Sequence, residues 1–221
     1  KNETLKPIIK SNSDAVKLKV DGKLKVYYFD VGQADAIVIE NNGNYMLIDA
    51  GNNADGKNLV DYFKRMGIKK FDRVIATHAH EDHIGGMDDI LNNFEVAHFY
   101  MPDVVTTTKT FEDVITALED NNVELEIPKA GGVFILGSCK FEVLHVGNED
   151  DDLNDSSIVV RGLFGDNSFL FTGDATGKVE ETLLDENIDS DVLKVGHHGS
   201  KYSSTDEFLA AVTPEYAIIS V

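Results

Sequence analysis

The sequence predicts an α/β sandwich in which two mixed sheets carry helices on their outer faces. Two observations support this fold class. Apolar stretches with strand patterning alternate with stretches of helical spacing along nearly the whole chain of 221 residues, and each half of the chain has enough strands for a sheet of its own. Because alternating strands and helices pack as layers around a common core, we expect one domain rather than two independent ones.

The first half of the chain ends near Glu126 and begins with three strands, LKVYYFDV, DAIVIE and NYMLIDAG, joined by turns rich in Gly and Asn. The next stretch, LVDYFKRMG, has apolar residues at helical spacing and ends at Gly67, a residue type common at helix ends. The remaining elements of this half are the strand RVIAT, a helix from about Met87, the strand VAHFYM and the helix TFEDVITALEDN.

The second half follows the same style without repeating the sequence. GGVFILG, CKFEVLHV, SSIVVRGLF and SFLFTGD are predicted to be consecutive strands, and the turn Gly165-Asp166-Asn167 joins the last two. KVEETLLDE is then a helix, DVLKVG a strand, TDEFLAAV a helix and YAIISV a final strand. The polar residues 1–22 are predicted to be a leader or linker, so we expect a single domain over residues 23–221.

The composition is strongly acidic, because 20 Lys and Arg oppose 39 Asp and Glu and give a formal net charge of −19. A field of this sign repels polyanions and attracts divalent cations, so it excludes a strongly basic DNA-binding module and predicts no strong binding of nucleic acid. No apolar run reaches the roughly 18 residues needed to cross a bilayer, so we expect no transmembrane segment. The one cysteine, Cys139, is interpreted as a packed structural residue.

The stretch RVIATHAHEDHIGG places three histidines and two carboxylates within six consecutive positions, directly after a short apolar strand. Residues two apart in an extended segment point the same way, so His78 and His80 can direct both imidazoles to one point. Asp82 and His83 follow where the chain must turn, and they can face a second point nearby. This spacing predicts a dinuclear metal site, in which the two cations are typically ~3.5–4 Å apart.

Two later stretches add donors in the same context, at the end of a strand. FLFTGDA carries Asp174, and LKVGHHGS carries His197 and His198. A Gly-Asp pair alone is more often a turn than a ligand, but together the three stretches offer a set of imidazole and carboxylate donors for two metals. His98 and His145 stand apart from these donors, and we interpret them as ordinary structural residues.

These residues carry a resemblance to a known family. THAHEDHIGG resembles the His-x-His-x-Asp-His signature of the metallo-β-lactamase-fold superfamily. DVGQADAIVIE, MLIDAG, FLFTGD and LKVGHHGS are similar in order and spacing to the motifs of its competence-protein branch, the ComEC/Rec2-like hydrolase domains. The resemblance covers about Lys25 to Val221, and it implies a four-layer αββα sandwich with two metals at one edge, between the sheets.

The resemblance also implies which side chains bind the metals, and it leaves one choice open within the HHGS stretch. The implied ligands are His78 and His80 for the first metal, Asp174 as the bridge between the metals, and Asp82, His83 and either His197 or His198 for the second.

Three further residues are implied to support the ligands rather than to bind metal. Asp49, in LIDAG, matches a position that orients a metal-binding histidine, with an ordinary turn residue as the alternative. Gln33 and Asp35, in VGQADA, match a Gly-Gln-x-Asp motif of the branch and are expected at the edge of the site, with a role in a turn as the alternative.

The chain departs from the family pattern between the first motif and the bridging aspartate. Many members have a third histidine for the first metal there, whereas this interval holds only His98 and His145. The segment LNDSSIVVR resembles an Asn- and Ser-containing motif of the competence branch instead, so Asn154, Asp155 and Ser157 are candidates to face the site. We expect the first metal either to bind weakly or to complete its set of ligands with water.

Two cations that share a water molecule lower its pKa towards ~7 and neutralise charge on the electrophile, which suits hydrolysis of a phosphodiester or another ester by a metal-bound hydroxide. Zinc is the expected metal and manganese the second choice, since imidazole and carboxylate donors suit both. The Gly199-Ser200 turn offers backbone N–H groups to a phosphate, with a plain turn before a helix as the alternative. Asp82, Asp174 and His198 are expected to take part in catalysis, and Ser200, Lys201, Asn154 and Ser157 to contact the substrate.

The expected function is therefore that of a metal-dependent phosphodiesterase, either nuclease-like or acting on phosphodiesters of the cell surface. The resemblance to exported relatives favours an extracellular or surface-anchored location, and a cytoplasmic location is the alternative. The alternative function is a non-catalytic module that binds metal or a partner on the same fold, and the missing third histidine is the feature that motivates it.

Overall fold

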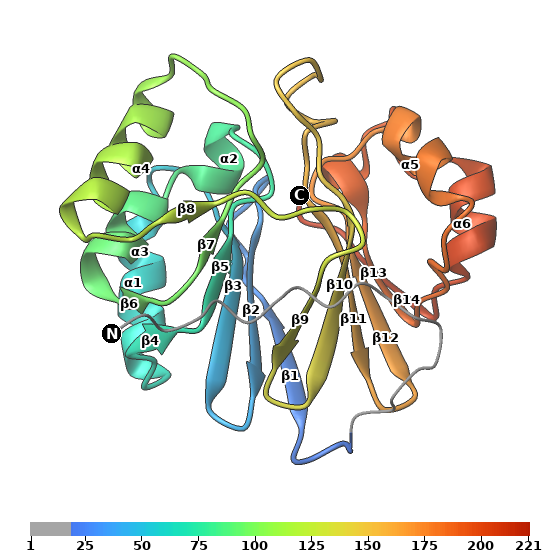
Figure 1. The fold of residues 1–221 in the computed structure, drawn as a ribbon, viewed down its shortest axis with the longest axis horizontal. Helices are drawn as coiled ribbons and strands as arrows, with labels where there is room; N and C mark the ends of the chain where they lie inside the picture. Colours follow the sequence, from blue (N-terminus) through green and yellow to red (C-terminus); the bar gives the residue numbers. More distant parts are fainter. Residues whose placement is uncertain (1–18) are drawn as a thin grey trace, which may run out of the picture.

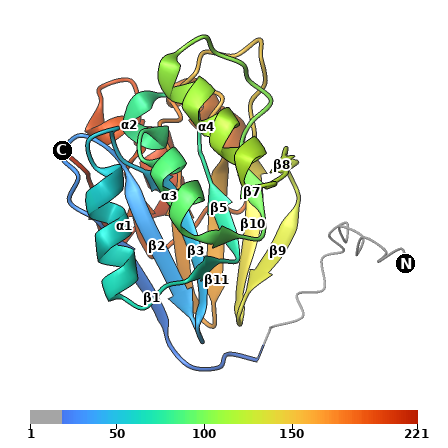
Figure 2. The ribbon, with the colours of Figure 1, turned by 90° about the vertical axis from the view of Figure 1, so that its left-hand side faces the viewer.

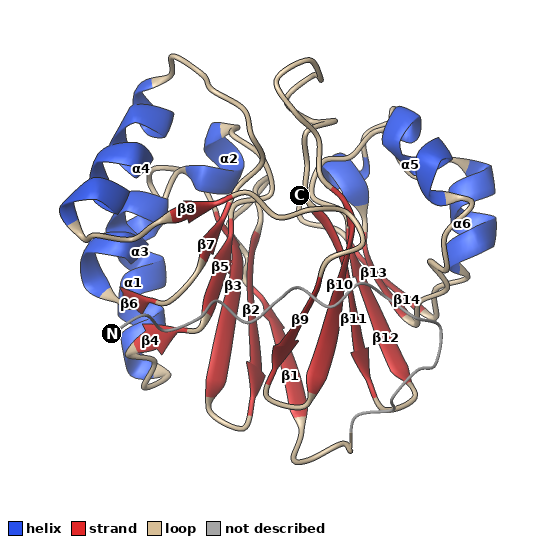
Figure 3. Ribbon diagram, in the orientation of Figure 1, coloured by secondary structure: helices blue, strands red, loops and turns tan. Residues whose placement is uncertain are grey.

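A computed structural model describes residues 19–221, so residues 1–18, which make up most of the predicted leader, lie outside the described part. The described chain forms two six-stranded sheets that face each other, with helices on the outer side of each (Figures 1 and 3). This arrangement confirms the predicted four-layer αββα sandwich. None of the helices within residues 19–221 is long and apolar enough to span a membrane.

The first sheet is built, in order across the sheet, from β1 (Leu24–Tyr28), β2 (Ala36–Asn41), β3 (Asn44–Ala50), β5 (Arg73–Ile75), β7 (Phe99–Tyr100) and β8 (Leu125–Glu126). Its first two pairings are antiparallel and the other three are parallel. Helices cover its outer face, as Figure 2 shows. They are α1 (Gly56–Arg65), α3 (Met87–Asn93), α4 (Lys109–Asp120) and the short α2 (Glu81–Ile84).

The second sheet is built from β14 (Tyr216–Ile218), β13 (Val192–Lys194), β12 (Asn167–Phe171), β11 (Val159–Phe164), β10 (Cys139–His145) and β9 (Val133–Leu136). Here β9 to β12 pair as an antiparallel meander, and β12, β13 and β14 are parallel. The outer side carries α5 (Gly177–Leu183) and α6 (Asp206–Val212). Both sheets are mixed, as the sequence predicted.

Apolar side chains that alternate along the strands form the core. In β2, Ile37 and Ile39 belong to the cluster between the sheets, which also contains Phe141 of β10. Val38, the residue between them, belongs instead to the cluster under α1, α3 and α4, together with Phe63. Because successive residues of a strand point to opposite faces, one strand supplies two layers of the core. A third cluster fills the space between the second sheet and its two helices.

The prediction of one strand over VAHFYM is wrong. This stretch divides between β6 (Glu95–Val96), which pairs with the short strand β4 (Lys70–Phe71), and β7 in the main sheet. The backbone changes partner midway: the N–H of Ala97 donates to the carbonyl of Phe71 at 3.0 Å, whereas the carbonyl of His98 accepts from the N–H of Val74 at 2.9 Å. The apolar alternation continues through this change of partner, so the sequence does not reveal it.

Gly85 and Gly86, at the end of α2, make a close backbone approach to the turn after β3. A Cβ atom on Gly85 would lie 2.2 Å from backbone atoms of Asn52 and Asn53, and one on Gly86 would lie 2.5 Å from the carbonyl oxygen of Ala50. Only glycine fits at these distances. The end of α2 is therefore pressed directly against the turn that follows β3.

Four strand ends meet at one edge of the sandwich. β3 and β5 are parallel neighbours in the first sheet, and β12 and β13 are parallel neighbours in the second. The carboxyl ends of parallel strands share an edge, and such edges are where open α/β sheets collect functional side chains. All of the donor stretches that the sequence singled out follow one of these four strands.

Candidate metal centre

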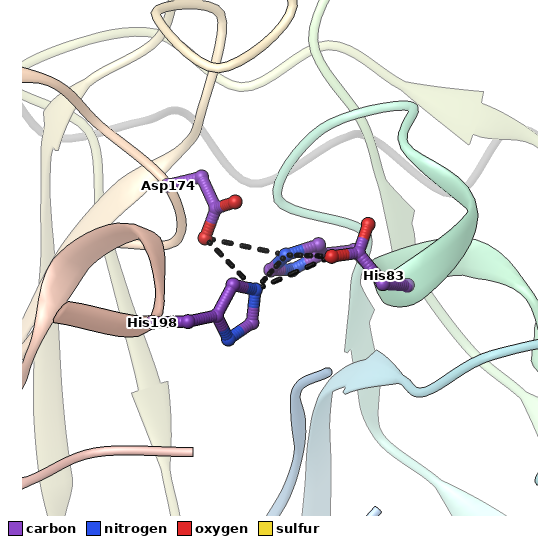
Figure 4. Close-up of side chains that lie close together, drawn as sticks. His83, Asp174 and His198 are labelled. Atoms are coloured by element: carbon purple, nitrogen blue, oxygen red, sulfur yellow. Dashed lines mark hydrogen bonds and ion pairs between the residues drawn. The ribbon is translucent and has the colours of Figure 1, made fainter. Parts of the chain in front are cut away.

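The candidate metal centre is built from donors of both halves of the chain. Asp82 and His83 lie on α2 in the first half, whereas Asp174 follows β12 and His198 follows β13 in the second. One atom from each of the four side chains lies within 4.8 Å of the corresponding atom of every other. Figure 4 shows the side chains of His83, Asp174 and His198 directed towards one point from two sides.

The distances within this group are those of donors around a shared position. Nε2 of His83 lies 3.2 Å from Oδ1 of Asp174 and 3.3 Å from Nε2 of His198. Nε2 of His198 lies 3.3 Å from Oδ2 of Asp82 and 3.6 Å from Oδ1 of Asp174. We call these four residues, Asp82, His83, Asp174 and His198, the four-donor group.

Hydrogen bonds at the opposite side of each ring fix which nitrogen faces the group. Nδ1 of His83 donates to Oδ2 of Asp49 at 2.8 Å, and Nδ1 of His198 donates to the backbone carbonyl of Ser220 at 3.2 Å. A neutral imidazole that donates through Nδ1 carries a lone pair on Nε2. The two Nε2 atoms therefore present lone pairs to each other and to two carboxylates.

This donor chemistry fits a divalent cation. Two lone pairs at 3.3 Å repel each other unless a proton or a cation lies between them. Oδ1 of Asp174 is buried without a hydrogen-bond partner among the described residues, which an unfilled ligand position explains. Imidazole nitrogens with carboxylate oxygens are the donors that zinc and manganese accept.

Without metal, the same contacts shift the pKa values of all four members of the group, among them His83 and Asp174. Burial alone would lower the pKa of His83, but the carboxylates of Asp49 and Asp174 raise it well above its usual value. Burial alone would raise the pKa of Asp174, yet the close approach and charge of His83, with smaller contributions from His78 and His198, hold it far below its usual value. A proton and a metal ion therefore compete for the same place.

Candidate donors for a first metal lie on the side of the other oxygen of Asp174. Nε2 of His78 and Nε2 of His197 each lie 3.9 Å from Oδ2 of Asp174, and Nδ1 of His80 lies 3.0 Å from Nε2 of His78. Within residues 19–221 these donors do not form a group whose ligand atoms all lie within 4.8 Å of one another. Burial and the neighbouring imidazole of His83 lower the pKa of His78, which keeps it neutral as a ligand must be.

Consecutive histidines reach different sides of Asp174 because of their backbone. His197 and His198 have φ values of 50° and 52°, in the left-handed region, inside a short turn over Gly196–Gly199. Non-glycine residues in this region cost of order 1 kcal/mol or more, and they persist where the surrounding structure holds them. Two hydrogen bonds do so here: the N–H of His197 donates to the carbonyl of Gly173, and the N–H of Ser200 donates to the carbonyl of His197.

Comparison with known proteins agrees with this geometry. Residues 29–221 match the family profile of the metallo-beta-lactamase superfamily. The chain belongs to this superfamily. It is 32% identical over 217 residues to ComE operon protein 3 of Bacillus subtilis (strain 168), covering 89% of this chain and 28% of that protein. It is also 32% identical over 197 residues to recombination protein 2 of Haemophilus influenzae, covering 86% of this chain and 23% of that protein.

These relatives place the superfamily member in the ComEC/Rec2-like branch, and the chain spans about a quarter of their length. Solved structures show the same fold at low sequence identity. Human tRNase Z, short form, has a TM-score of 0.53 at 14% identity over 87% of this chain and 92% of that one. The metallo-beta-lactamase fold protein YhfI from Bacillus subtilis has a TM-score of 0.52 at 15% identity over 72% and 62%. The fold is one that binds divalent metals.

In this superfamily member Asp49 supports histidines of both donor sets. Besides accepting from His83, its Oδ2 accepts from the hydroxyl of Thr77 at 2.7 Å, and its Oδ1 accepts from the N–H of Thr77 at 2.8 Å. The Thr77 oxygen lies 3.1 Å from Nδ1 of His78, which can donate to it. Thr77 was not predicted as a site residue, although its position between the strand and the first histidine was a usable signal.

The two residues of the GQAD motif have different surroundings. Asp35 is buried, and one of its oxygens lies in a second close group with Asp49 and His83. Its Oδ2 is 2.7 Å from Nζ of Lys194, a buried residue that was not predicted from the sequence either. Gln33 is exposed, and none of the hydrogen bonds within residues 19–221 joins it to the donors.

Two of the four residues expected to contact the substrate, Ser157 and Ser200, already use polar groups in hydrogen bonds within the protein. The hydroxyl of Ser157 is buried, accepts from the N–H of Asp174 at 3.0 Å and lies 3.4 Å from Nδ1 of His78, so it positions donors rather than facing open space. The N–H of Ser200 is already used by the carbonyl of His197 at 2.8 Å and is not free for a phosphate.

The remaining residues singled out in the sequence have surroundings of their own. Lys201 is exposed and its Nζ lies 5.0 Å from the ring centre of Tyr202. Asn154 has a buried side-chain oxygen without a hydrogen-bond partner among the described residues. Asp155 faces Thr176, whose hydroxyl donates to it at 2.6 Å. His98 pairs with Glu126 and His145 with the carbonyl of Asp155, so neither joins the donors.

Proposed function

We propose that this chain is a metal-dependent hydrolase that acts on phosphodiesters through a dinuclear centre. The observation that carries the proposal is the four-donor group, in which two Nε2 lone pairs and two carboxylates converge within 4.8 Å. Hydrogen bonds behind the rings direct the Nε2 atoms of His83 and His198 towards the two carboxylates. The superfamily includes dinuclear metal hydrolases, and this geometry supports placing the chain among them.

The donors divide between the two oxygens of Asp174. The group around Oδ1 would hold one cation through His83, His198 and Asp82, whereas His78 and His80 would hold the other beside Oδ2. When bound, such a pair of cations lowers the pKa of a shared water towards ~7 and offsets charge on the electrophile. We propose zinc as the first choice and manganese as the second.

The protein residues orient the donors and handle the substrate. Asp49 holds the tautomer of His83 directly and that of His78 through Thr77, and the carbonyl of Ser220 does the same for His198. This contact supports His198 as the metal ligand of the HHGS stretch. His197 keeps 27% of its side chain exposed, so it is placed to donate a hydrogen bond to a bound phosphoryl oxygen or a proton to the leaving group.

The names of similar proteins favour a phosphodiester substrate. The relatives are named for competence and recombination, and human tRNase Z, which shares the fold, is named for an activity on tRNA. The net charge of −19 opposes an extended electrostatic grip on a polyanion. The proposed substrate is therefore recognised at the metal centre itself rather than along a basic surface.

The test combines metal content with turnover on one sample. Protein purified without chelator is expected to carry close to two equivalents of zinc or manganese by plasma mass spectrometry and to hydrolyse bis-p-nitrophenyl phosphate. His198→Ala should lose both metal and activity. His98→Ala removes a histidine paired with Glu126 outside the centre and should lose neither.

A chain that binds metal yet turns over no phosphodiester would contradict the proposal. The alternative of a non-catalytic metal- or partner-binding module would then lead. The looser arrangement of the first donor set, in which His78, His80 and Asp174 do not close into one tight group, is the observation that favours that alternative.

A further inference from the structure

A buried ion pair joins the two halves of the molecule beside the metal centre. Nζ of Lys194, at the end of β13, lies 2.7 Å from Oδ2 of Asp35, in the loop before β2, and both side chains are at most 2% exposed. Nζ also donates to the carbonyl of Val195 at 2.9 Å. Neither side chain is a proposed metal ligand.

Stability alone is a poor reason for such a pair. Removing two charges from water costs several kcal/mol per ion, and a buried ion pair is often no more stabilising than apolar side chains of the same volume. Buried ion pairs are better attested where they specify one arrangement of the chain. The contacts of Asp35 and Lys194 indicate which arrangement this pair specifies.

Asp35 is tied to the ligands of the first half through its backbone. Its N–H donates to the carbonyl of Asp82 at 3.2 Å, and its carbonyl accepts from the N–H of Gly51 at 2.8 Å. Asp82 is a proposed ligand, and Gly51 belongs to the turn that follows Asp49. A shift of Asp35 would therefore move both the ligand segment and the turn that orients His83.

Lys194 is tied to the ligands of the second half through its strand. It lies in register between Phe171 of β12 and Ile218 of β14, and its carbonyl accepts from the hydroxyl of Thr172 at 2.9 Å. Asp174 lies two residues after Thr172, and His198 lies four residues after Lys194. The ammonium group thus connects the segment that holds Asp174 and His198 to the segment that holds Asp82 and His83.

We propose that Lys194 is a positioning residue that sets the spacing of the metal centre by clamping its two donor halves together through Asp35. The four-donor group takes two residues from each half of the chain. The 3.3 Å separation between Nε2 of His83 and Nε2 of His198 therefore depends on the position of one half relative to the other. Sites of this kind lose affinity when donors shift by much less than a bond length. This inference rests on the proposed metal centre.

The sign of the change in metal affinity separates this role from a purely electrostatic one. A fixed positive charge repels a nearby divalent cation, so if Lys194 acted through its charge alone, Lys194→Met would strengthen metal binding. If Lys194 acts as a clamp, the same variant weakens binding. The double variant Asp35→Asn/Lys194→Met removes both charges and leaves none unpaired, so the electrostatic account predicts wild-type affinity for it, whereas the clamp account predicts weak binding again.

The experiment measures cobalt(II) and zinc binding to chelator-treated protein, by calorimetry and by the visible ligand-field spectrum of cobalt, without substrate. Both variants are expected to bind the tighter equivalent at least ~10-fold more weakly and to show a changed cobalt spectrum, the size of effect typical of residues that orient ligands. Lys140→Met is the matched control. It removes an ion pair with Glu142 in the same sheet, at partly exposed side chains, and should leave affinity and spectrum unchanged.

Two outcomes would overturn the inference. Wild-type or tighter metal binding by folded Lys194→Met or by the double variant would show that the pair does not set the spacing. A double variant that does not fold would show that the pair serves stability alone. Failure of the proposed function is seen separately, because the wild-type chain itself then either binds no metal in this assay or binds metal and hydrolyses no bis-p-nitrophenyl phosphate.

Discussion

Oδ2 of Asp49 lies 2.8 Å from Nδ1 of His83, and both side chains are fully buried. Asp49 has a φ of 58°, a left-handed conformation that is unusual for a residue in a strand. The same oxygen accepts from Thr77, which in turn contacts His78. One carboxylate at the end of β3 therefore orients histidines of both donor sets.

Asp49→Ala is expected to weaken metal binding at both positions by ~10- to 100-fold, because His83 and His78 lose the groups that fix their tautomers. The measurement is metal affinity by competition with a chromogenic chelator. Asp61→Ala, which removes an exposed carboxylate from α1, is the control and should bind as the wild type does. Unchanged affinity in Asp49→Ala would contradict the orienting role.

Thr77→Val should act on the first donor set alone. Valine fills the same volume, but it cannot link Asp49 to His78, while the direct contact of Asp49 with His83 stays. We expect stoichiometry to fall from two equivalents of metal towards one, with the tighter equivalent retained. Loss of both equivalents together would show that Thr77 supports the fold rather than His78.

His198→Ala and His197→Ala should have different effects, although the residues are neighbours. His198 is expected to be required for the tighter metal, so its loss removes metal and activity together. His197→Ala is expected to keep the tighter metal and to lower kcat by ~10²-fold or more, as loss of a group that donates to the reacting substrate does. Equal loss of tightly bound metal in both variants would refute this division.

The stability of the metal-free chain should fall as pH rises above 6.5. The pKa of His83 is raised in the folded chain, so the stabilisation from its charged form is complete below its unfolded value near 6.5 and is lost as pH rises through the folded value. The free energy of unfolding, measured by urea denaturation with chelator present, should decline over this range. Metal affinity should increase over the same range, because the competing proton leaves.

The carboxylate of Asp174 should make the free energy of unfolding fall at low pH. Its pKa is lowered in the folded chain, so its contribution is present above the usual value of 3.8 and is lost as pH falls through the lower folded value. His83→Ala is the control for the alkaline limb. If that limb kept the same slope in His83→Ala, another group would be responsible for it.

Gly85→Ala should cost much more stability than Gly67→Ala. A Cβ on Gly85 would overlap the backbone of Asn52 and Asn53, so α2 must move away from the turn after β3, at a cost of about 2 kcal/mol or more. Gly67 has open space around its Cβ position and only a left-handed φ, so alanine there costs about 1 kcal/mol. Urea denaturation of both variants measures the difference, and equal costs would contradict the close approach.

Local patterns predicted much of the fold because each element carries its own signal. The alternation in β2 and the helical spacing in α4 reflect which face of the element is buried. This face shows as a periodicity of apolar residues within a short stretch of sequence. Short elements escaped the same reasoning. The helix α2 has four residues and β6 has two, too few for any periodicity to show, and the tertiary contacts at Gly85 and Phe71 decide them.

The sequence alone predicted the candidate donors, because histidines and aspartates that follow the carboxyl ends of parallel strands share one edge of the sandwich. The division of these candidates between two positions follows from tertiary contacts. The left-handed turn directs His197 to one oxygen of Asp174 and His198 to the other, and Thr77 and Lys194 act on donors far away in the sequence. These roles depend on contacts between the two halves of the chain, and such contacts leave no local pattern in the residues that make them.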